Sequence, residues 1–260
     1  MGIKKWLKGI GKNTLFYPGC LTKFVLKQEA DNYKKILIKI GIDFIMLPDE
    51  FCCGSPALNA GYESDAIKLA RKNIENFKKH DIKRIITNCP ACYKNFLNYK
   101  EMLPDWDIEV EHITSIILGY LRKKNIKYRL NDRVTYHDPC HLGRHSKIYD
   151  EPREILERLG FEVIEMRNNR ENALCCGGGA GLKTNNPELA NKIAMKRIEQ
   201  AKSININKII TTCPLCFAHL GENSDIEIIE FSYAVACALG LKPGKTNLKK
   251  EKKELKEACS

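Results

Sequence analysis

The sequence has no long apolar run. Its longest apolar stretch, 234–239, is far shorter than a bilayer span, and the first residues lack the apolar segment of a secretory signal peptide. We therefore expect no transmembrane segment and predict a cytoplasmic protein.

Acidic residues are scarce at both ends of the chain. The net charge is +11, but residues 1–12 carry four lysines and no acid, and residues 242–260 carry seven lysines against three glutamates. The ends supply most of the positive charge, so the body offers little attraction to a phosphate backbone and we predict no nucleic-acid partner. The lysine-rich segment 242–260 is expected to be a disordered tail or a frayed helix.

Disulfide bonds are not expected, although the chain has twelve cysteines. The cytosol keeps thiols reduced, and 260 residues with 43% hydrophobic content can bury a large core without cross-links. So many thiols indicate metal binding instead.

The sequence repeats with a period of about 120 residues when Cys20 is aligned with Cys140. In each copy, strand-like runs alternate with helical segments. The first runs begin at Leu15 and Thr135, and the later ones are expected at 42–45, 84–87 and 108–112 and at 161–164, 208–211 and 226–230. Long helices are expected at 64–79 and 187–202, and the last helix of each copy has a plausible N-cap, Thr114 or Ser232.

This alternation predicts an α/β fold with two duplicated Rossmann-like halves, each a mainly parallel sheet with helices on both faces. We place the halves at 13–122 and 133–241, joined by a charged linker near 122–132.

Ten of the twelve cysteines form two matching sets of five. Each set has a single cysteine, a Cys-Cys-Gly and a Cys-Pro-x-Cys: Cys20, Cys52, Cys53, Cys89 and Cys92 in the first, and Cys140, Cys175, Cys176, Cys213 and Cys216 in the second. We expect every one of them to follow a strand, so that each set meets at the carboxyl edge of its sheet. The remaining two, Cys237 and Cys259, are expected to be a structural residue and a free thiol.

Two kinds of metal site fit such a set. Mononuclear zinc takes four tetrahedral ligands, and an adjacent cysteine pair would crowd one ion, whereas an iron-sulfur cluster can spread five thiolates over several irons. Clusters in both halves are favoured, and a zinc-stabilised interaction module remains the alternative. Gly54, Gly177 and Gly178 are predicted to let the backbone approach the cofactor closely.

The arrangement Cys…Cys-Cys-Gly…Cys-Pro-x-Cys, present twice, resembles the cysteine-rich CCG domain in the B-type and D-type subunits of heterodisulfide reductase. The resemblance runs from about Leu15 to Leu239 and is strongest in YHDPCHLGR at 136–144 and ENALCCGGG at 171–179. It implies that each five-cysteine set holds a [4Fe-4S] cluster, of a type that can be non-cubane. It also implies that paired clusters supply one electron to each sulfur of a disulfide, such as the coenzyme M-coenzyme B heterodisulfide.

One feature of these relatives is missing. The D-type subunit and several related oxidoreductases carry a ferredoxin-like module with closely spaced Cys-x-x-Cys-x-x-Cys signatures, and this sequence has none. The resemblance therefore implies an electron partner, either a ferredoxin-like iron-sulfur subunit or a flavoprotein. It also leaves a second function open: an electron-transfer subunit of a flavin-dependent 2-hydroxy acid (glycolate, lactate or glycerol-3-phosphate) dehydrogenase or of a fumarate reductase, acting on an organic acid.

Histidines flank the cysteine of the second copy. His137 or His141 could give a proton to a leaving thiolate, or could hydrogen-bond to cluster sulfur without taking part in the chemistry. Arg144 and Lys183 could attract an anionic substrate or be ordinary surface charges. His112 and His219 are expected to be structural.

Overall fold

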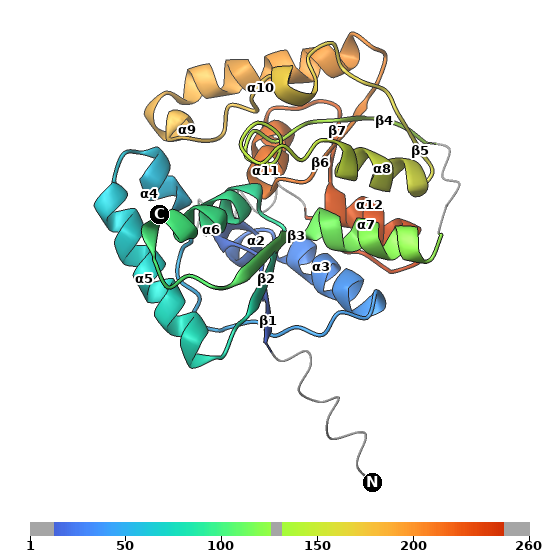
Figure 1. The fold of residues 1–260 in the computed structure, drawn as a ribbon. Helices are drawn as coiled ribbons and strands as arrows, with labels where there is room; N and C mark the ends of the chain where they lie inside the picture. Colours follow the sequence, from blue (N-terminus) through green and yellow to red (C-terminus); the bar gives the residue numbers. More distant parts are fainter. Residues whose placement is uncertain (1–12, 126–131, 247–260) are drawn as a thin grey trace.

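The structure is a computed structural model that describes residues 13–125 and 132–246 (Figure 1). The first half contains β1 (Thr14–Tyr17), α2 (Cys20–Phe24), α3 (Lys27–Lys39), α4 (Ser55–Asn59), α5 (Glu63–Lys79), β2 (Arg84–Thr87), α6 (Pro90–Met102), β3 (Glu109–His112) and α7 (Ile113–Lys123). The second half contains β4 (Asp132–Tyr136), α8 (Asp150–Arg158), β5 (Phe161–Val163), the short 3-10 helix η2 (Arg170–Asn172), α9 (Leu182–Asn185), α10 (Pro187–Lys202), β6 (Lys208–Thr211), α11 (Pro214–Glu222), β7 (Glu227–Glu230) and α12 (Phe231–Ala238).

Each half has its own parallel sheet, as predicted. The strand orders are β1-β2-β3 and β5-β4-β6-β7. The run 42–45 lies beside β1, in the place that β5 takes beside β4, and with it the two strand orders match. Within this run only Ile45 pairs, through a parallel bridge to Leu15. The predicted strand at 42–45 is therefore wrong as a full strand.

The inner faces of the two sheets share one hydrophobic core. Because side chains alternate along a strand, Phe16 and Ile86 of the first sheet and Tyr136 and Ile210 of the second point into this shared core. The helices between the sheets, α3, α7, α8 and α12, complete it. The opposite faces are covered separately, by α5 and α6 in the first half and by α10 and α11 in the second.

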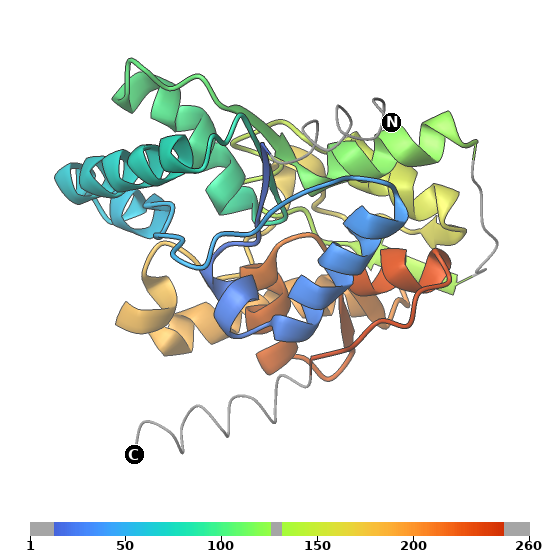
Figure 2. The same ribbon diagram turned by 90° about the horizontal axis from the view of Figure 1, so that it is seen from below.

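The two halves meet through equivalent helices. α3 packs against α12, and α7 packs against α8. By position in the repeat α3 corresponds to α8 and α7 to α12, so the contact has an approximate two-fold symmetry. Figure 2 shows α3 lying alongside α12. The domain boundaries 13–122 and 133–241 remain a prediction. Helix α7 extends into the expected linker as far as Lys123. Residues 126–131 of that linker lie outside the described residues.

The predicted caps of α7 and α12 are wrong by two residues. The N-caps are His112 and Glu230, whose side chains accept hydrogen bonds from the backbone N–H groups of Thr114 and Ser232. Both residues end the last strand of their sheet, so an imidazole and a carboxylate take the role that serine and threonine usually fill. His112 is structural in this sense, as expected.

The start of the lysine-rich segment, residues 242–246, contacts α3, and the predicted tail 242–260 as a whole remains a prediction. The Asn32 side chain donates to the Gly244 carbonyl at 2.8 Å and accepts from the Gly244 N–H at 2.9 Å. Glu29 accepts from the Thr246 N–H at 3.1 Å. These buried side chains of α3 satisfy the backbone of 242–246, while residues 1–12 and 247–260, including Cys259, lie outside the described residues. None of the helices in the described ranges is both long and apolar enough to span a bilayer.

The Glu230 carboxyl predicts a measurable pH dependence of stability. It accepts hydrogen bonds from Tyr33 at 2.7 Å and from the Ser232 N–H at 2.6 Å, and burial raises its pKa from 4.5 to about 7. Because the folded state binds this proton more tightly, the free energy of unfolding is highest below the unfolded pKa. It falls as pH rises from about 4.5 toward 7.

We expect Glu230→Gln to remove this contribution, because an amide can accept from Ser232 and donate to the Tyr33 oxygen without ionising. The difference between the melting temperatures at about pH 5.5 and about pH 8 should be smaller for the variant than for the parent protein. Glu227→Gln, on the same strand but paired with Lys245 at the surface, is the control. If the melting temperature changed equally with pH in all three proteins, Glu230 would not be the source of the pH dependence.

Candidate metal centres

The first five thiols converge between β1, β2 and the loop before α4. Cys20 begins α2, directly after β1, and Cys89 is the N-cap of α6, directly after β2. Since β1 and β2 are parallel neighbours, their carboxyl ends bring these two residues together. Each thiol then lies close enough to the next to shift its pKa, in the order Cys20, Cys52, Cys53, Cys92 and Cys89.

The second five thiols repeat this order. Cys140 follows β4, and Cys213, the N-cap of α11, follows β6. The chain of contacts runs from Cys140 to Cys175, Cys175 to Cys176, Cys176 to Cys216, and Cys216 to Cys213. The sulfurs of Cys176 and Cys216 are 3.3 Å apart. The structure thus brings all ten predicted cysteines into two sets of five.

The cysteine pairs do not directly follow a strand, and this part of the prediction is wrong. Cys52 and Cys53 come after a loop, and the second pair comes after η2. Helices of the outer face hold the first pair: Asn73 of α5 donates to the Cys52 carbonyl at 2.9 Å, and Tyr99 of α6 donates to the Cys53 carbonyl at 2.8 Å. Side-chain amides and phenols therefore do the positioning that strand pairing was expected to do.

The thiols within each set strongly perturb one another. A hydrogen bond with Cys52, followed by burial, raises the pKa of Cys20, while hydrogen bonds from Cys20 and Cys53 lower the pKa of Cys52 to about 2. Cys140 and Cys175 shift in the same two directions for the same reasons. Neighbouring thiolates repel each other, so five of them can ionise together only around added positive charge. The donor set therefore fits a centre of several metal ions.

Backbone groups also favour negative charge on sulfur. The N–H groups of Gly54, Gly177 and Gly178 point to Cys52, Cys175 and Cys176 at 3.5, 3.4 and 3.4 Å. In addition, α6 and α11 direct their N-termini toward the Cys-Pro-x-Cys thiols, which lie in their first turns.

The predicted glycines are constrained by the helices beside them. Gly54 and Gly177 have φ values of +87° and +85°, and a Cβ on Gly177 would lie 2.5 Å from the Ala190 carbonyl oxygen. A Cβ on Gly178 would meet His219 at 3.0 Å. Their close approach to a cofactor remains a prediction. Gly19, which the sequence interpretation missed, faces the thiols instead, since its Cβ would lie 3.0 Å from the Cys92 sulfur.

His137 and His141 occupy different environments. His137 is buried, and one of its ring nitrogens lies within 4.8 Å of the sulfurs of Cys176 and Cys216. His141 is half-buried, with Nδ1 3.4 Å from the Cys140 sulfur and Nε2 3.4 Å from the Asn59 amide of the first half. Burial, and then the neighbouring His145, lower the pKa of His141. His141 therefore lies where the second thiol set meets the first half.

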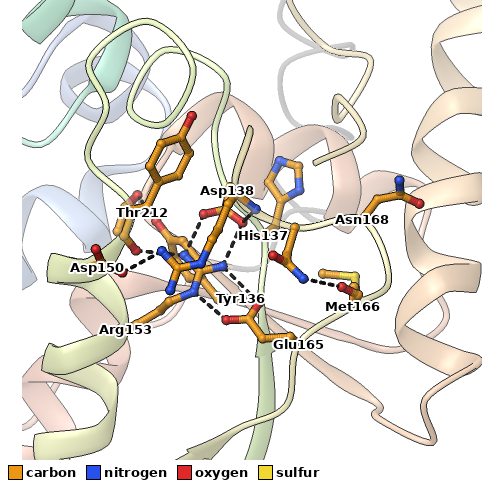
Figure 3. Close-up of polar contacts among 12 residues, drawn as sticks. Tyr136, His137, Asp138, Asp150, Arg153, Glu165, Met166, Asn168 and Thr212 are labelled. Carbon is orange, nitrogen blue, oxygen red and sulfur yellow. Dashed lines mark hydrogen bonds and ion pairs between the residues drawn. The ribbon is translucent and has the colours of Figure 1, made fainter. Parts of the chain in front are cut away.

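A buried ion network fixes the loop that carries Cys140. Arg153 of α8 donates to both carboxylate oxygens of Asp138, at 2.7 and 2.9 Å, and to Glu165 at 2.9 Å. Asp138 also accepts from the Arg170 N–H at 2.8 Å. Figure 3 shows Arg153 between Asp138 and Glu165, with the His137 ring directed away from the network. The prediction missed this network because its members are far apart in sequence.

The other candidate residues have protein partners. Arg144 donates to the Ala173 carbonyl at 2.7 Å, and Lys183 forms an ion pair with Glu222 at 2.8 Å. His219 is buried and lies 3.2 Å from the Ala190 carbonyl, which supports its expected structural role. Cys237, which was expected to be a structural residue, is exposed on α12.

Known proteins resemble this chain in sequence and fold. It is 35% identical over 243 residues to the D-type subunit of the dihydromethanophenazine:CoB-CoM heterodisulfide reductase of Methanosarcina acetivorans, a match that covers 88% of this chain and 59% of that protein. It is 34% identical to the EtfAB:quinone oxidoreductase of Syntrophomonas wolfei, covering 80% of this chain and 31% of the relative. It is 30% identical to the B-type subunit of the fumarate reductase (CoM/CoB) of Methanothermobacter marburgensis, covering 86% and 45%. The chain therefore spans less than two thirds of the length of these relatives.

A solved structure shares the fold. A hypothetical protein from Helicobacter pylori superposes with a TM-score of 0.70 at 13% identity, over 92% of this chain and 51% of the other. At this identity the likeness concerns the fold alone.

The CCG cysteine-rich domain matches the sequence twice, at residues 14–96 and 134–221. Each match lies within one of the two halves and ends beyond the Cys-Pro-x-Cys of its set. Together with the paired sets of five thiols, these two matches show that the chain belongs to the CCG cysteine-rich domain family.

Proposed function

We propose that this chain is an iron-sulfur oxidoreductase subunit that binds one [4Fe-4S] cluster at each five-cysteine set and passes electrons to a small-molecule disulfide. The observation that carries the proposal is the gathering of five thiols in each half, in the same order of contacts. The heterodisulfide reductase named among the relatives supports the choice of a disulfide, such as the coenzyme M-coenzyme B heterodisulfide, as substrate.

The donor set fits this cofactor better than zinc. One tetrahedral zinc would use four thiolates and leave the fifth beside it without a metal. Soft thiolates, backbone N–H groups aimed at sulfur and two helix N-termini suit a cluster of several irons, whether cubane or non-cubane. All ten cysteines of the two sets are assigned as its ligands.

A bound cluster supplies single electrons, and the protein must supply protons to the thiolates that leave. His141 is placed for that role, because its ring lies 3.4 Å from the Cys140 sulfur and remains half-buried rather than sealed. Cys20 and Cys175 are the exposed members of their sets, so each set is open to solvent at one thiol. A disulfide substrate would enter on these open sides.

A second candidate function is electron relay to a flavoprotein. The match to the EtfAB:quinone oxidoreductase and to the fumarate reductase favours it. In that case the chain would carry electrons for a flavin-dependent 2-hydroxy acid dehydrogenase or a fumarate reductase. Either function requires a partner, a ferredoxin-like subunit or a flavoprotein, and both are compatible with the cytoplasm.

Disulfide reduction can be tested with the anaerobically purified protein and a reduced one-electron dye. Oxidation of the dye on addition of a heterodisulfide is expected for the parent protein and is expected to be lost in Cys176→Ser and Cys213→Ser. Cys237→Ser, which changes an exposed thiol outside both sets, should retain the parent rate. Unchanged turnover in Cys176→Ser would remove the proposed site from the reaction. No turnover by any of these proteins, with dye oxidation restored by a flavoprotein partner, would favour the relay.

A further inference from the structure

The buried surroundings of the two thiol sets differ at two equivalent positions. His137 lies three residues before Cys140, where the first half has Tyr17 before Cys20. The glycine after each cysteine pair lies against an alanine of the outer helix, Gly54 against Ala66 of α5 and Gly177 against Ala190 of α10. With these alanines aligned, Arg197 of α10 corresponds to Asn73 of α5. The second half thus has an imidazole and a guanidinium where the first half has a phenol and an amide.

Arg197 fixes the tautomer of His137. The Arg197 Nε donates to His137 Nδ1 at 3.0 Å, and both side chains are fully buried. Arginine has no acceptor atom, so Nδ1 must be the unprotonated nitrogen and Nε2 must carry the hydrogen. Burial and the charge of Arg197 lower the pKa of His137, which agrees with a neutral ring.

Both residues have a buried donor without a partner among the described residues, His137 Nε2 and Arg197 Nη2. The rest of the Arg197 guanidinium is satisfied by the Asn168 carbonyl at 2.6 Å and by the Gln200 side chain at 2.8 Å, and none of these described contacts is an ion pair. Arg153 already pairs with the nearby carboxylates of Asp138 and Glu165. Unsatisfied buried donors are unfavourable, so an acceptor is expected beside them.

The first half offers no equivalent donor among its described residues. Tyr17 donates to the Phe51 carbonyl at 2.6 Å, and Asn73 donates to the Cys52 carbonyl and to Tyr99. In the described part of this half, the buried side-chain atoms without a partner are all acceptors, on Glu50, Asn73 and Asn88. The charges nearest the first thiol set, Lys23 and Glu50, pair with each other at 3.1 Å. The first set therefore lacks, among the described residues, a buried donor without a partner that could reach its sulfur atoms.

We propose that the second-half cluster has the higher reduction potential of the two, because His137 Nε2–H and Arg197 Nη2–H donate hydrogen bonds to its sulfur atoms. One ring nitrogen of His137 lies within 4.8 Å of the Cys176 and Cys216 sulfurs, which places the ring beside the proposed cluster site. Hydrogen bonds and positive charge stabilise the extra negative charge of a reduced cluster. One electron delivered by a reduced ferredoxin-like partner then resides on the second-half cluster. The inference rests on the clusters of the proposed function.

The test is a redox titration of the purified protein, followed by electron paramagnetic resonance. The signals are assigned to halves with Cys89→Ser and Cys213→Ser, each of which removes the cluster of its own half. In the parent protein the second-half cluster should be reduced first. His137→Leu should make its reduction about tenfold less favourable, which is about 59 mV for one electron. Arg197→Gln should lower the same potential, and Tyr17→Phe, the equivalent change in the first half, should alter neither cluster.

Iron analysis separates the two proposals. If the parent protein holds no iron, the clusters themselves are wrong. If His137→Leu retains its iron and both potentials are unchanged, or if the first-half cluster is reduced first in the parent protein, only the present inference fails.

A measurement that keeps His137 covers a His137 variant that fails to assemble. In reduced His141→Gln protein labelled with ¹⁵N-histidine, which lacks the imidazole beside Cys140, a weak nuclear coupling to the second-half cluster is expected from a hydrogen bond through His137 Nε2–H. No coupling would overturn the inference, and the strong coupling of a direct iron ligand would also overturn it.

Discussion

Replacing Cys213 with serine is expected to halve the iron content of the protein. The parent chain should hold about eight irons and eight acid-labile sulfides, four of each per cluster, and the variant about four. Cys89→Ser is the matched change in the first half and should give the same number. The loss of iron should stay within one half because the buried thiols of the two sets lie in two different hydrophobic clusters and not in the shared core.

Metal analysis of anaerobically purified protein measures this directly, with Cys237→Ser as the control that keeps all of its iron. Spectra of the two half-loaded variants should add up to the spectrum of the parent. Two zinc ions and no iron in the parent protein would replace the clusters with the zinc-stabilised module. Loss of all iron from either variant would show that the two centres do not assemble independently.

Replacing Arg153 with methionine is expected to destabilise the fold strongly. The substitution leaves the Asp138 carboxylate buried without its bidentate partner and also frees Glu165. Removal of one member of a buried ion pair costs about 3–5 kcal/mol, because the remaining charge stays desolvated. For a chain of this size the melting temperature should fall by about 10 °C.

Arg122→Met is the control. Arg122 pairs with Glu154 on the exposed face of α7, where solvent screens the interaction, and its loss should leave the melting temperature close to that of the parent. The double variant Arg153→Met with Asp138→Asn should recover part of the loss, because the stranded charge is removed. Equal melting temperatures for Arg153→Met and Arg122→Met would contradict the importance of the buried network.

The duplication and the ten thiols could be predicted because both are local patterns. Cys-Pro-x-Cys at the start of a helix after a strand fixes its own geometry, and α10 occupies the predicted 187–202. Parallel pairing of the strands before Cys20 and Cys89 then brings distant cysteines together without further information. The predicted α/β halves with parallel sheets are confirmed for these reasons.

What could not be predicted depends on contacts between distant segments. The caps at His112 and Glu230 use side chains that are rarely N-caps, so propensity favoured Thr114 and Ser232. The contact of Arg197 with His137 joins residues 60 apart in the sequence, and no local pattern indicates it. The order in 242–246 depends on acceptors and donors of α3, more than 200 residues earlier in the sequence.

The symmetric contact of α3 with α12 and of α7 with α8 bears on how such a chain could arise. A single repeat on its own would leave the apolar sides of its first and last helices in water, and two identical copies could cover them by turning face to face. Gene fusion of such a homodimer would keep the contact while releasing the copies from identity. Substitutions such as histidine for tyrosine at position 137 could then accumulate on one side only, which an assembly of identical subunits can never achieve.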